Sequence, residues 1–192
     1  MAALVLASGS PYRAQLLARL GLEFTQRPAD LDEAVLPGES PEDYVCRLAR
    51  EKAEAVAAHE PEAIIIGSDQ CSECQGQILG KPLTEDAAIA QLANASGQRV
   101  TLWTAVAVRD PPTGRMGVAQ VPTHVQFRRL GHEAIRRYVQ AEQPLDCAGA
   151  FRAEGLGIAL FERIEGDDPN ALIGLPMIAL VRLLSQVGVV LP

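Results

Sequence analysis

The chain has 192 residues, of which 48% are hydrophobic and 21% charged, so it can bury a substantial core as one compact domain or two small lobes. This composition excludes a disordered chain, a collagen-like repeat and a disulfide-stapled miniprotein. Because the formal net charge is −7, we expect no nucleic-acid polymer and no anionic membrane as a partner, and a phosphate ligand would need a few local cations.

The first apolar run, residues 2–7, stops at Ser8-Gly9-Ser10-Pro11 and is too short for a signal-peptide core. No apolar stretch approaches the length of a membrane span. We therefore expect a cytoplasmic protein with reduced cysteines. Cys71 and Cys74 have Cys-x-x-Cys spacing, but neither a second such pair nor a nearby histidine completes a metal site. We expect incidental thiols beside a strand, and a thiol redox protein is kept as an alternative.

The N-terminal third alternates strand and helix. Residues 4–7 are typical of a buried strand, and Ser10-Pro11 predicts a helix start with the end at Gly21. Ser40-Pro41 repeats the start signal for a long helix through Val56. A second buried strand is expected over residues 64–66, followed by a short polar segment, 67–70, at its carboxyl end.

The remaining elements include a helix capped by Thr84 and a tight turn at Gln75-Gly76. The other expected elements are a hairpin of residues 100–108 and 118–127, a helix over 132–139, a glycine-rich stretch over 148–157, a strand near 158–161 and a helix over 176–187. This alternation predicts an α/β fold with a mixed sheet.

Two places could carry chemistry, because ligands of open α/β sheets gather where strands end and helices begin. The first is the segment from Ser8 to Arg13, which combines hydroxyls, a helix start and a guanidinium. The second is Asp69 with Lys81, a carboxylate and an ammonium that can serve a metal, a proton transfer or a phosphate. The alternatives are a helix cap at the first place and an Asx-type turn with a solvated lysine at the second.

Other charged residues carry less weight. Arg47, Arg50, Glu51 and Lys52 share one helix, and most of them are expected on a solvated face. The three histidines lack ligand spacing and are expected at the surface: His59, His124 and His132.

Six short motifs follow one another along nearly the whole chain. They are Leu6-Ala7-Ser8-Gly9-Ser10-Pro11-Tyr12-Arg13, Glu33 in an acidic loop, Arg47-Leu48-Ala49-Arg50-Glu51-Lys52-Ala53, Gly67-Ser68-Asp69-Gln70, Gly80-Lys81-Pro82 and Gly174-Leu175-Pro176. In order and spacing they resemble the Maf-like nucleoside triphosphate pyrophosphatases. Four segments resemble the branch that hydrolyses 7-methyl-GTP: 67–70, 147–151, 154–155 and 160–163. Two residues depart from the pattern: Ala14 replaces a second arginine, and Tyr12 replaces a tryptophan.

The resemblance implies a single Maf-like domain over residues 1–192, with a mixed twisted sheet, flanking helices and two lobes around a central cleft, as in inosine triphosphatases. It also implies pyrophosphate release that depends on Mg²⁺ or Mn²⁺, and often a homodimer. It assigns the proton acceptor to Asp69 and a metal-side acid to Glu33. The other implied roles are triphosphate contacts for Ser8, Arg13, Lys52 and Lys81, and base selection for Tyr12, Gln70 and Glu154.

The expected reaction converts 7-methyl-GTP to 7-methyl-GMP and pyrophosphate and so removes a modified nucleotide from the pool. Two alternatives stay open: a pyrophosphatase for dTTP or UTP, and a non-enzymatic regulator of cell division that senses nucleotides. Intact Asp69, Lys52 and Lys81 argue against an inactive enzyme.

Overall fold

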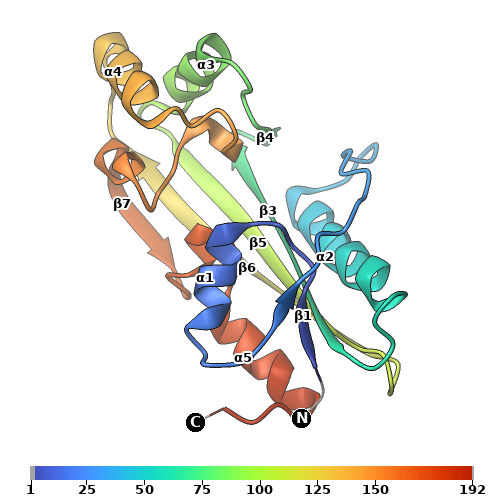
Figure 1. Cartoon of the computed structure of the whole chain (residues 1–192). Helices are drawn as coiled ribbons and strands as arrows, with labels where there is room; N and C mark the ends of the chain where they lie inside the picture. The colour runs from blue at the N-terminus through green and yellow to red at the C-terminus, as the bar shows by residue number, and fades with distance from the viewer. Residues whose placement is uncertain (1–2, 192) are drawn as a thin grey trace. The chain divides into compact units, whose positions relative to one another are not determined.

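The structure is a computed structural model that describes residues 3–191, so the predicted domain ends at residues 1 and 192 lie outside the described part. Its helices and strands follow the chain in the order labelled in Figure 1. They are β1 (Leu4–Leu6), α1 (Pro11–Ala18), β2 (Thr25–Gln26), α2 (Pro41–Ala57), β3 (Ile64–Cys74), β4 (Gln77–Leu79), α3 (Glu85–Ala95), β5 (Arg99–Asp110), β6 (Arg115–Phe127), α4 (His132–Glu142), β7 (Phe161–Gly166) and α5 (Met177–Gln186). Short 3₁₀ helices cover Ala148–Ala150, Leu156–Leu160 and Ala171–Ile173.

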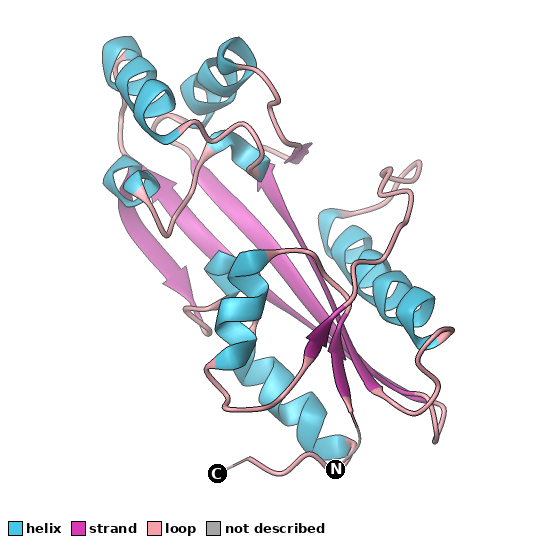
Figure 2. Cartoon of the chain, in the orientation of Figure 1, coloured by secondary structure: helices cyan, strands magenta, loops and turns pink. Residues whose placement is uncertain are grey.

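The strands form one mixed sheet, which confirms the predicted α/β class (Figure 2). Over the described residues its order is β2-β1-β3-β5-β6-β7, with β4 paired to β3. β1 runs parallel to β2 and β3, whereas β4 and β7 run antiparallel to their partners. None of the helices within residues 3–191 has the length and apolar character needed to cross a membrane.

The chain divides into two compact units. The first comprises residues 1–70, 104–121 and 168–192, and the second comprises residues 71–103 and 122–167. In the second unit α3 packs against α4. The buried Phe127 and Phe151 pack there with the half-buried Phe161, and the three rings meet edge to face with centroids 5.2–5.5 Å apart.

The predicted helix starts are confirmed. Each predicted N-cap hydroxyl accepts the backbone N–H three residues on: Ser10 from Arg13, Ser40 from Asp43 and Thr84 from Ala87. The predicted turn at Gln75-Gly76 joins β3 to β4, and both of its residues have positive φ, 53° and 79°.

Two predicted strands are wrong in extent. β3 does not end at Ile66, so residues 67–70 lie inside a strand that runs to Cys74. Pairing of β3 with β1 stops at Leu6↔Ile66. Beyond that point β5 still adjoins β3, and β4 pairs with the last residues of β3, so the polar segment stays within the sheet. The strand expected near 158–161 is instead β7, residues 161–166, at the sheet edge. Five of the six residues of β7 are exposed and three are charged, so no apolar run marks it.

The first unit has helices on both faces of β1 and β3. One face carries an apolar cluster with α1 and α5 (Figure 1). From the strands this cluster includes Leu4, Leu6, Ile64 and Ile66. The opposite face meets α2 at Gly67, where an added Cβ would lie 2.1 Å from the carbonyl oxygen of Ala49.

Successive side chains of β3 point to opposite faces of the sheet, and this alternation determines where its polar residues point. Asp69 is two residues beyond Gly67 and therefore lies on the face that α2 covers. Ser68 and Gln70 lie on the other face, where their side chains bond to the backbone of residues 171–174. A single strand thus supplies polar groups to two different layers.

Candidate active site

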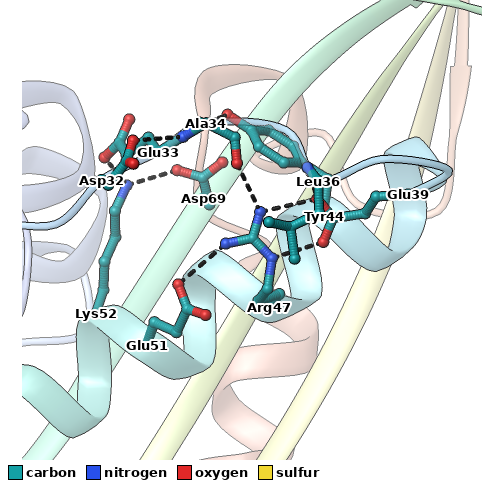
Figure 3. A network of polar contacts seen from close by, with 10 residues as sticks. All are labelled: Asp32, Glu33, Ala34, Leu36, Glu39, Tyr44, Arg47, Glu51, Lys52 and Asp69. Carbon is teal, nitrogen blue, oxygen red and sulfur yellow. Dashed lines mark hydrogen bonds and ion pairs between the residues drawn. The ribbon is translucent and has the colours of Figure 1, made fainter.

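Three charged side chains of the first unit meet at one point. Lys52, from α2, places its Nζ 2.6 Å from Asp69 Oδ1 and 2.6 Å from Glu33 Oε1 (Figure 3). Lys52 and Asp69 are buried, whereas 49% of the Glu33 side chain is exposed. The ammonium therefore lies between one buried carboxylate and one that faces solvent. The expectation of a solvated face is wrong for Lys52, because α2 packs tightly on β3.

Burial governs the electrostatics of this cluster. It raises the pKa of the Asp69 carboxyl above its usual range, and the charges of Lys52 and Arg13 offset this only in part. Burial also lowers the pKa of the Arg13 guanidinium, while the negative charges of Asp69 and Glu33 raise it. A carboxylate whose pKa is raised by burial accepts a proton more readily than an exposed one.

Arg13 joins the segment after β1 to the turn before α5. Its Nε donates to the carbonyl of Gly174 at 2.8 Å, and its Nη1 donates to Ser8 Oγ at 3.3 Å. The same Gly174 carbonyl accepts a hydrogen bond from Ser68 Oγ at 3.0 Å. Gly174 has a φ of +118°, a backbone conformation that residues with a Cβ rarely adopt. Ser8 and the Arg13 cation are thus held together at the N-terminus of α1, which favours anions.

The two predicted base-selecting residues of the first unit differ in their surroundings. Tyr12 lies half-buried in the first turn of α1. Gln70 uses its Nε2 to donate to Thr104 Oγ1 at 2.9 Å and to the Ala171 carbonyl at 2.8 Å. Because these bonds occupy the side-chain nitrogen, a contact of Gln70 with a base would use its side-chain amide oxygen.

Lys81 and Glu154 belong to the second unit, and both are exposed. Glu154 lies in a loop that Glu142 holds, since Glu142 Oε2 accepts the Leu156 N–H at 2.7 Å. An added Cβ at Gly155 would lie 2.7 Å from Glu142 Oε1, so a side chain there would displace the Glu142 carboxylate.

The predicted residues that the structure brings together all lie in the first unit. Ser8 and Arg13 form one contact group, and Glu33, Lys52 and Asp69 form the other. Arg13 links the two groups through its electrostatic interaction with Asp69. These contacts show proximity, and the roles assigned to the residues of both groups stay predictions, as do those of Tyr12, Gln70, Lys81 and Glu154.

A polar network that the sequence patterns did not reveal surrounds Arg47 (Figure 3). Its guanidinium pairs with both carboxylate oxygens of Glu39, at 2.6 and 2.8 Å, and donates to Glu51 Oε2 at 3.1 Å. It also donates to the carbonyl of Ala34 at 3.0 Å. Only 20% of the Arg47 side chain is exposed, so the expected solvated position is wrong. In the sequence, the i,i+4 spacing of Arg47 and Glu51 was the one pattern that could have indicated part of this network. Such pairs usually lie on solvent-exposed helix surfaces.

Glu33 and Asp69 fit a divalent cation. Both present carboxylate oxygens to the same ammonium, which shows that the two groups can meet one positive charge. Within residues 3–191, no cluster of three or more His, Cys, Asp or Glu side chains could hold a metal ion alone. Mg²⁺ is commonly held by one or two carboxylates and completed by substrate phosphates, and this pair matches that arrangement.

The cysteines do not support a redox centre. Cys71 and Cys74 are three residues apart on β3 and therefore point to opposite faces of the sheet. Burial raises the pKa of the Cys74 thiol, whereas redox-active cysteines need a lowered pKa. The surface expectation for the histidines holds for His59 and His132, but His124 is half-buried and hydrogen-bonded to Thr101 at 3.1 Å.

Comparison with known proteins gives one consistent result. The family model described as "Maf-like protein" matches residues 3–187. A 7-methyl-GTP pyrophosphatase of Nitrosococcus oceani is 53% identical over 185 residues, which is 96% of this chain and 93% of that protein. A 7-methyl-GTP pyrophosphatase of Pseudomonas syringae pv. tomato is 52% identical over 192 residues, which is 100% of both chains.

A solved structure is similar as well. The HAM1 protein from Coxiella burnetii matches with a TM-score of 0.53 and 15% identity, over 97% of this chain and 98% of that one. At this identity the likeness concerns the fold alone, and it agrees with the mixed α/β architecture.

Proposed function

Because this chain belongs to the Maf-like protein family, we propose that it is a nucleotide pyrophosphatase that hydrolyses 7-methyl-GTP to 7-methyl-GMP and pyrophosphate. The reaction would remove a modified nucleotide from the pool. The observation that carries the proposal is the cluster of Lys52, Asp69 and Glu33, which combines a buried carboxylate, an ammonium and a solvent-facing carboxylate. These are the groups that hydrolysis of a phosphoric anhydride needs.

Asp69 acts as the proton acceptor in this proposal. Water attacks the α-phosphorus, its proton passes to the Asp69 carboxylate, and the bond from the α-phosphorus to the bridging oxygen breaks. Pyrophosphate leaves with that oxygen. In the metal-free protein burial raises the pKa of Asp69, which makes the carboxylate a stronger proton acceptor and supports the role.

The cations meet the triphosphate, which carries about four negative charges. A chain of net charge −7 needs local positive groups for this, and we assign them to Arg13, Lys52 and Lys81, with the Ser8 hydroxyl as a further donor. Held by Glu33 and Asp69, a divalent cation such as Mg²⁺ or Mn²⁺ would neutralise charge on the triphosphate and on the leaving pyrophosphate. Lys52, freed from one of its carboxylate partners, would then donate to phosphate oxygens.

Base selection is assigned to Tyr12, Gln70 and Glu154. Methylation at N7 gives guanine a delocalised positive charge and leaves N1–H and the N2 amine as donors on another edge. An electron-rich ring and a carboxylate complement these features. Tyr12 supplies the ring, Glu154 the carboxylate and Gln70 a polar contact.

We further propose a single Maf-like domain over residues 1–192, because the family match covers residues 3–187. The cytoplasmic location stays a prediction from the apolar pattern of the sequence, and the homodimer stays a prediction from the family resemblance.

The test of the catalytic assignment is pyrophosphate release by Asp69→Asn. The change keeps the shape and removes the charge, so we expect turnover to fall by about two to four orders of magnitude. Asp86→Asn removes one exposed charge from the first turn of α3 and serves as the matched control. A folded Asp69→Asn protein within a few-fold of wild-type turnover would remove Asp69 from the mechanism.

A further inference from the structure

The segment that carries Glu33 is not positioned by secondary structure. Between β2 and α2, where every residue is described, there is no helix or strand. Next along the chain, Val35 and Leu36 are 47% and 51% exposed, so core packing does not hold this stretch either. Polar contacts must therefore bring the Glu33 carboxylate to Lys52.

Arg47 supplies the strongest of these contacts. Its planar guanidinium makes a two-point pair with Glu39 and also reaches the Ala34 carbonyl (Figure 3). Only 8% of the Glu39 side chain is exposed. A two-point, largely buried pair of this kind is stronger and more directional than a surface ion pair. Glu39 Oε2 in turn accepts the Leu36 N–H at 3.0 Å, so the pair fixes the loop at two further backbone positions.

Tyr44 adds a second attachment from the same face of α2. Its hydroxyl donates to the backbone carbonyl of Glu33 at 2.9 Å, and the Arg47 guanidinium lies over its ring, 5.6 Å from the centroid. The carbonyls of Glu33 and of the next residue, Ala34, are thus both held by α2. The same helix carries Lys52, the partner of the Glu33 carboxylate.

We propose that Arg47 is a positioning residue for the cation site, which holds the loop of residues 32–39 on α2 so that Glu33 can share a cation with Asp69. This inference rests on the proposed function, because it takes Glu33 and Asp69 as the metal-side carboxylates. Arg47 acts through the backbone of the loop and through Glu39. Without it, the Glu33 carboxylate loses its fixed distance from Asp69 while Asp69 stays buried on β3.

The experiment measures Mn²⁺ binding to the complete chain, without nucleotide, by water-proton relaxation. Arg47→Met keeps most of the unbranched apolar part of the side chain and removes the guanidinium group. We expect Mn²⁺ affinity to fall by about 10- to 100-fold, as it does when groups that orient metal ligands are removed. The Mn²⁺ concentration needed for half-maximal pyrophosphate release should rise by a similar factor, with kcat at saturating Mn²⁺ within about threefold of wild type. Arg50→Met, an exposed arginine on the same helix, is the control and should leave both values unchanged.

Glu33→Gln distinguishes the positioning role of Arg47 from the role of Glu33 as a metal ligand. We expect it to weaken Mn²⁺ binding, and we expect the double variant Arg47→Met/Glu33→Gln to bind no more weakly than Glu33→Gln alone. If Glu33→Gln weakens binding and Arg47→Met does not, the role of Arg47 is overturned and the proposed function stands. If Glu33→Gln leaves binding unchanged, the metal assignment fails, and the inference about Arg47 fails with it.

Tyr44→Phe keeps the inference testable if Arg47→Met does not fold. It removes one hydroxyl donor to the Glu33 carbonyl and leaves the ring under Arg47. We expect a loss of Mn²⁺ affinity of about two- to tenfold, the usual effect of one hydrogen bond. Unchanged affinity in a folded Tyr44→Phe protein would overturn the proposal.

Discussion

Gly67→Ala tests how closely α2 must approach β3. Gly67 lies on β3, two residues before Asp69, and its missing side chain lets the backbone of α2 come into contact. An added Cβ would lie 2.1 Å from the Ala49 carbonyl oxygen and 2.9 Å from the Ala53 nitrogen. Both atoms belong to helical backbone, which cannot rotate away as a flexible side chain would.

The size of the effect follows from these distances. Ordinary van der Waals contact begins near 3.4 Å, so the helix must withdraw by about 1.3 Å, the difference between about 3.4 and 2.1 Å. Overpacking of this kind costs about 1–3 kcal/mol of unfolding free energy. Lys52 lies on α2 between the two contacted residues, and so it moves away from Asp69. A displacement of about 1 Å in a catalytic arrangement lowers turnover by about 100-fold.

Urea unfolding and pyrophosphate release measure the two effects separately. Gly131→Ala is the control, because its added Cβ meets no atom within 4 Å, and we expect it to cost less than about 1 kcal/mol and to keep wild-type turnover. A Gly67→Ala protein with wild-type stability and turnover would refute the close packing of α2 on β3 as the device that sets the distance between Lys52 and Asp69.

Two further predictions concern carboxylates. Glu154→Gln should lower kcat/KM for 7-methyl-GTP relative to dTTP and UTP by about 1–3 kcal/mol, because a charge-assisted contact with the base is lost; an equal loss on all nucleotides would exclude Glu154 from base selection. In metal-free protein the pKa of the Asp69 carboxyl is raised, so the folded state binds the carboxyl proton more tightly than the unfolded chain does. The free energy of unfolding therefore falls as the pH rises from about 3.9, the unfolded pKa, through the pKa of the folded state. Asp69→Asn should therefore gain unfolding free energy relative to wild type across that pH window, and a relative loss would show that the pairing with Lys52 outweighs burial.

Much of the fold follows from local patterns in the sequence. The N-caps at Ser10, Ser40 and Thr84 and the turn at Gln75-Gly76 lie where their hydrogen-bonding chemistry predicts. These features are determined by a few neighbouring residues. The extent of β3 is determined differently, because pairing with β4 and β5 keeps residues 67–74 extended, and no local pattern reports those partners.

The candidate site shows the same division. Asp69 and Lys52 stand out through motifs that resemble those of a family, and alternation along β3 explains why Asp69 faces α2. The role of Arg47 could not be predicted in this way, since its partners Glu39 and Ala34 lie in a loop without periodicity. A charged residue on an amphipathic helix is usually solvated, and only the path of the loop reverses that expectation here.

The measurement that tests the central claim most directly is a panel of nucleotides with the wild-type protein. 7-Methyl-GTP, GTP, dTTP, UTP and CTP are supplied at equal concentration with Mg²⁺ or Mn²⁺, and both pyrophosphate and orthophosphate are measured. We expect pyrophosphate and 7-methyl-GMP as products, with the highest kcat/KM for 7-methyl-GTP. A preference for dTTP or UTP, release of orthophosphate, or tight nucleotide binding without turnover would contradict the proposed function.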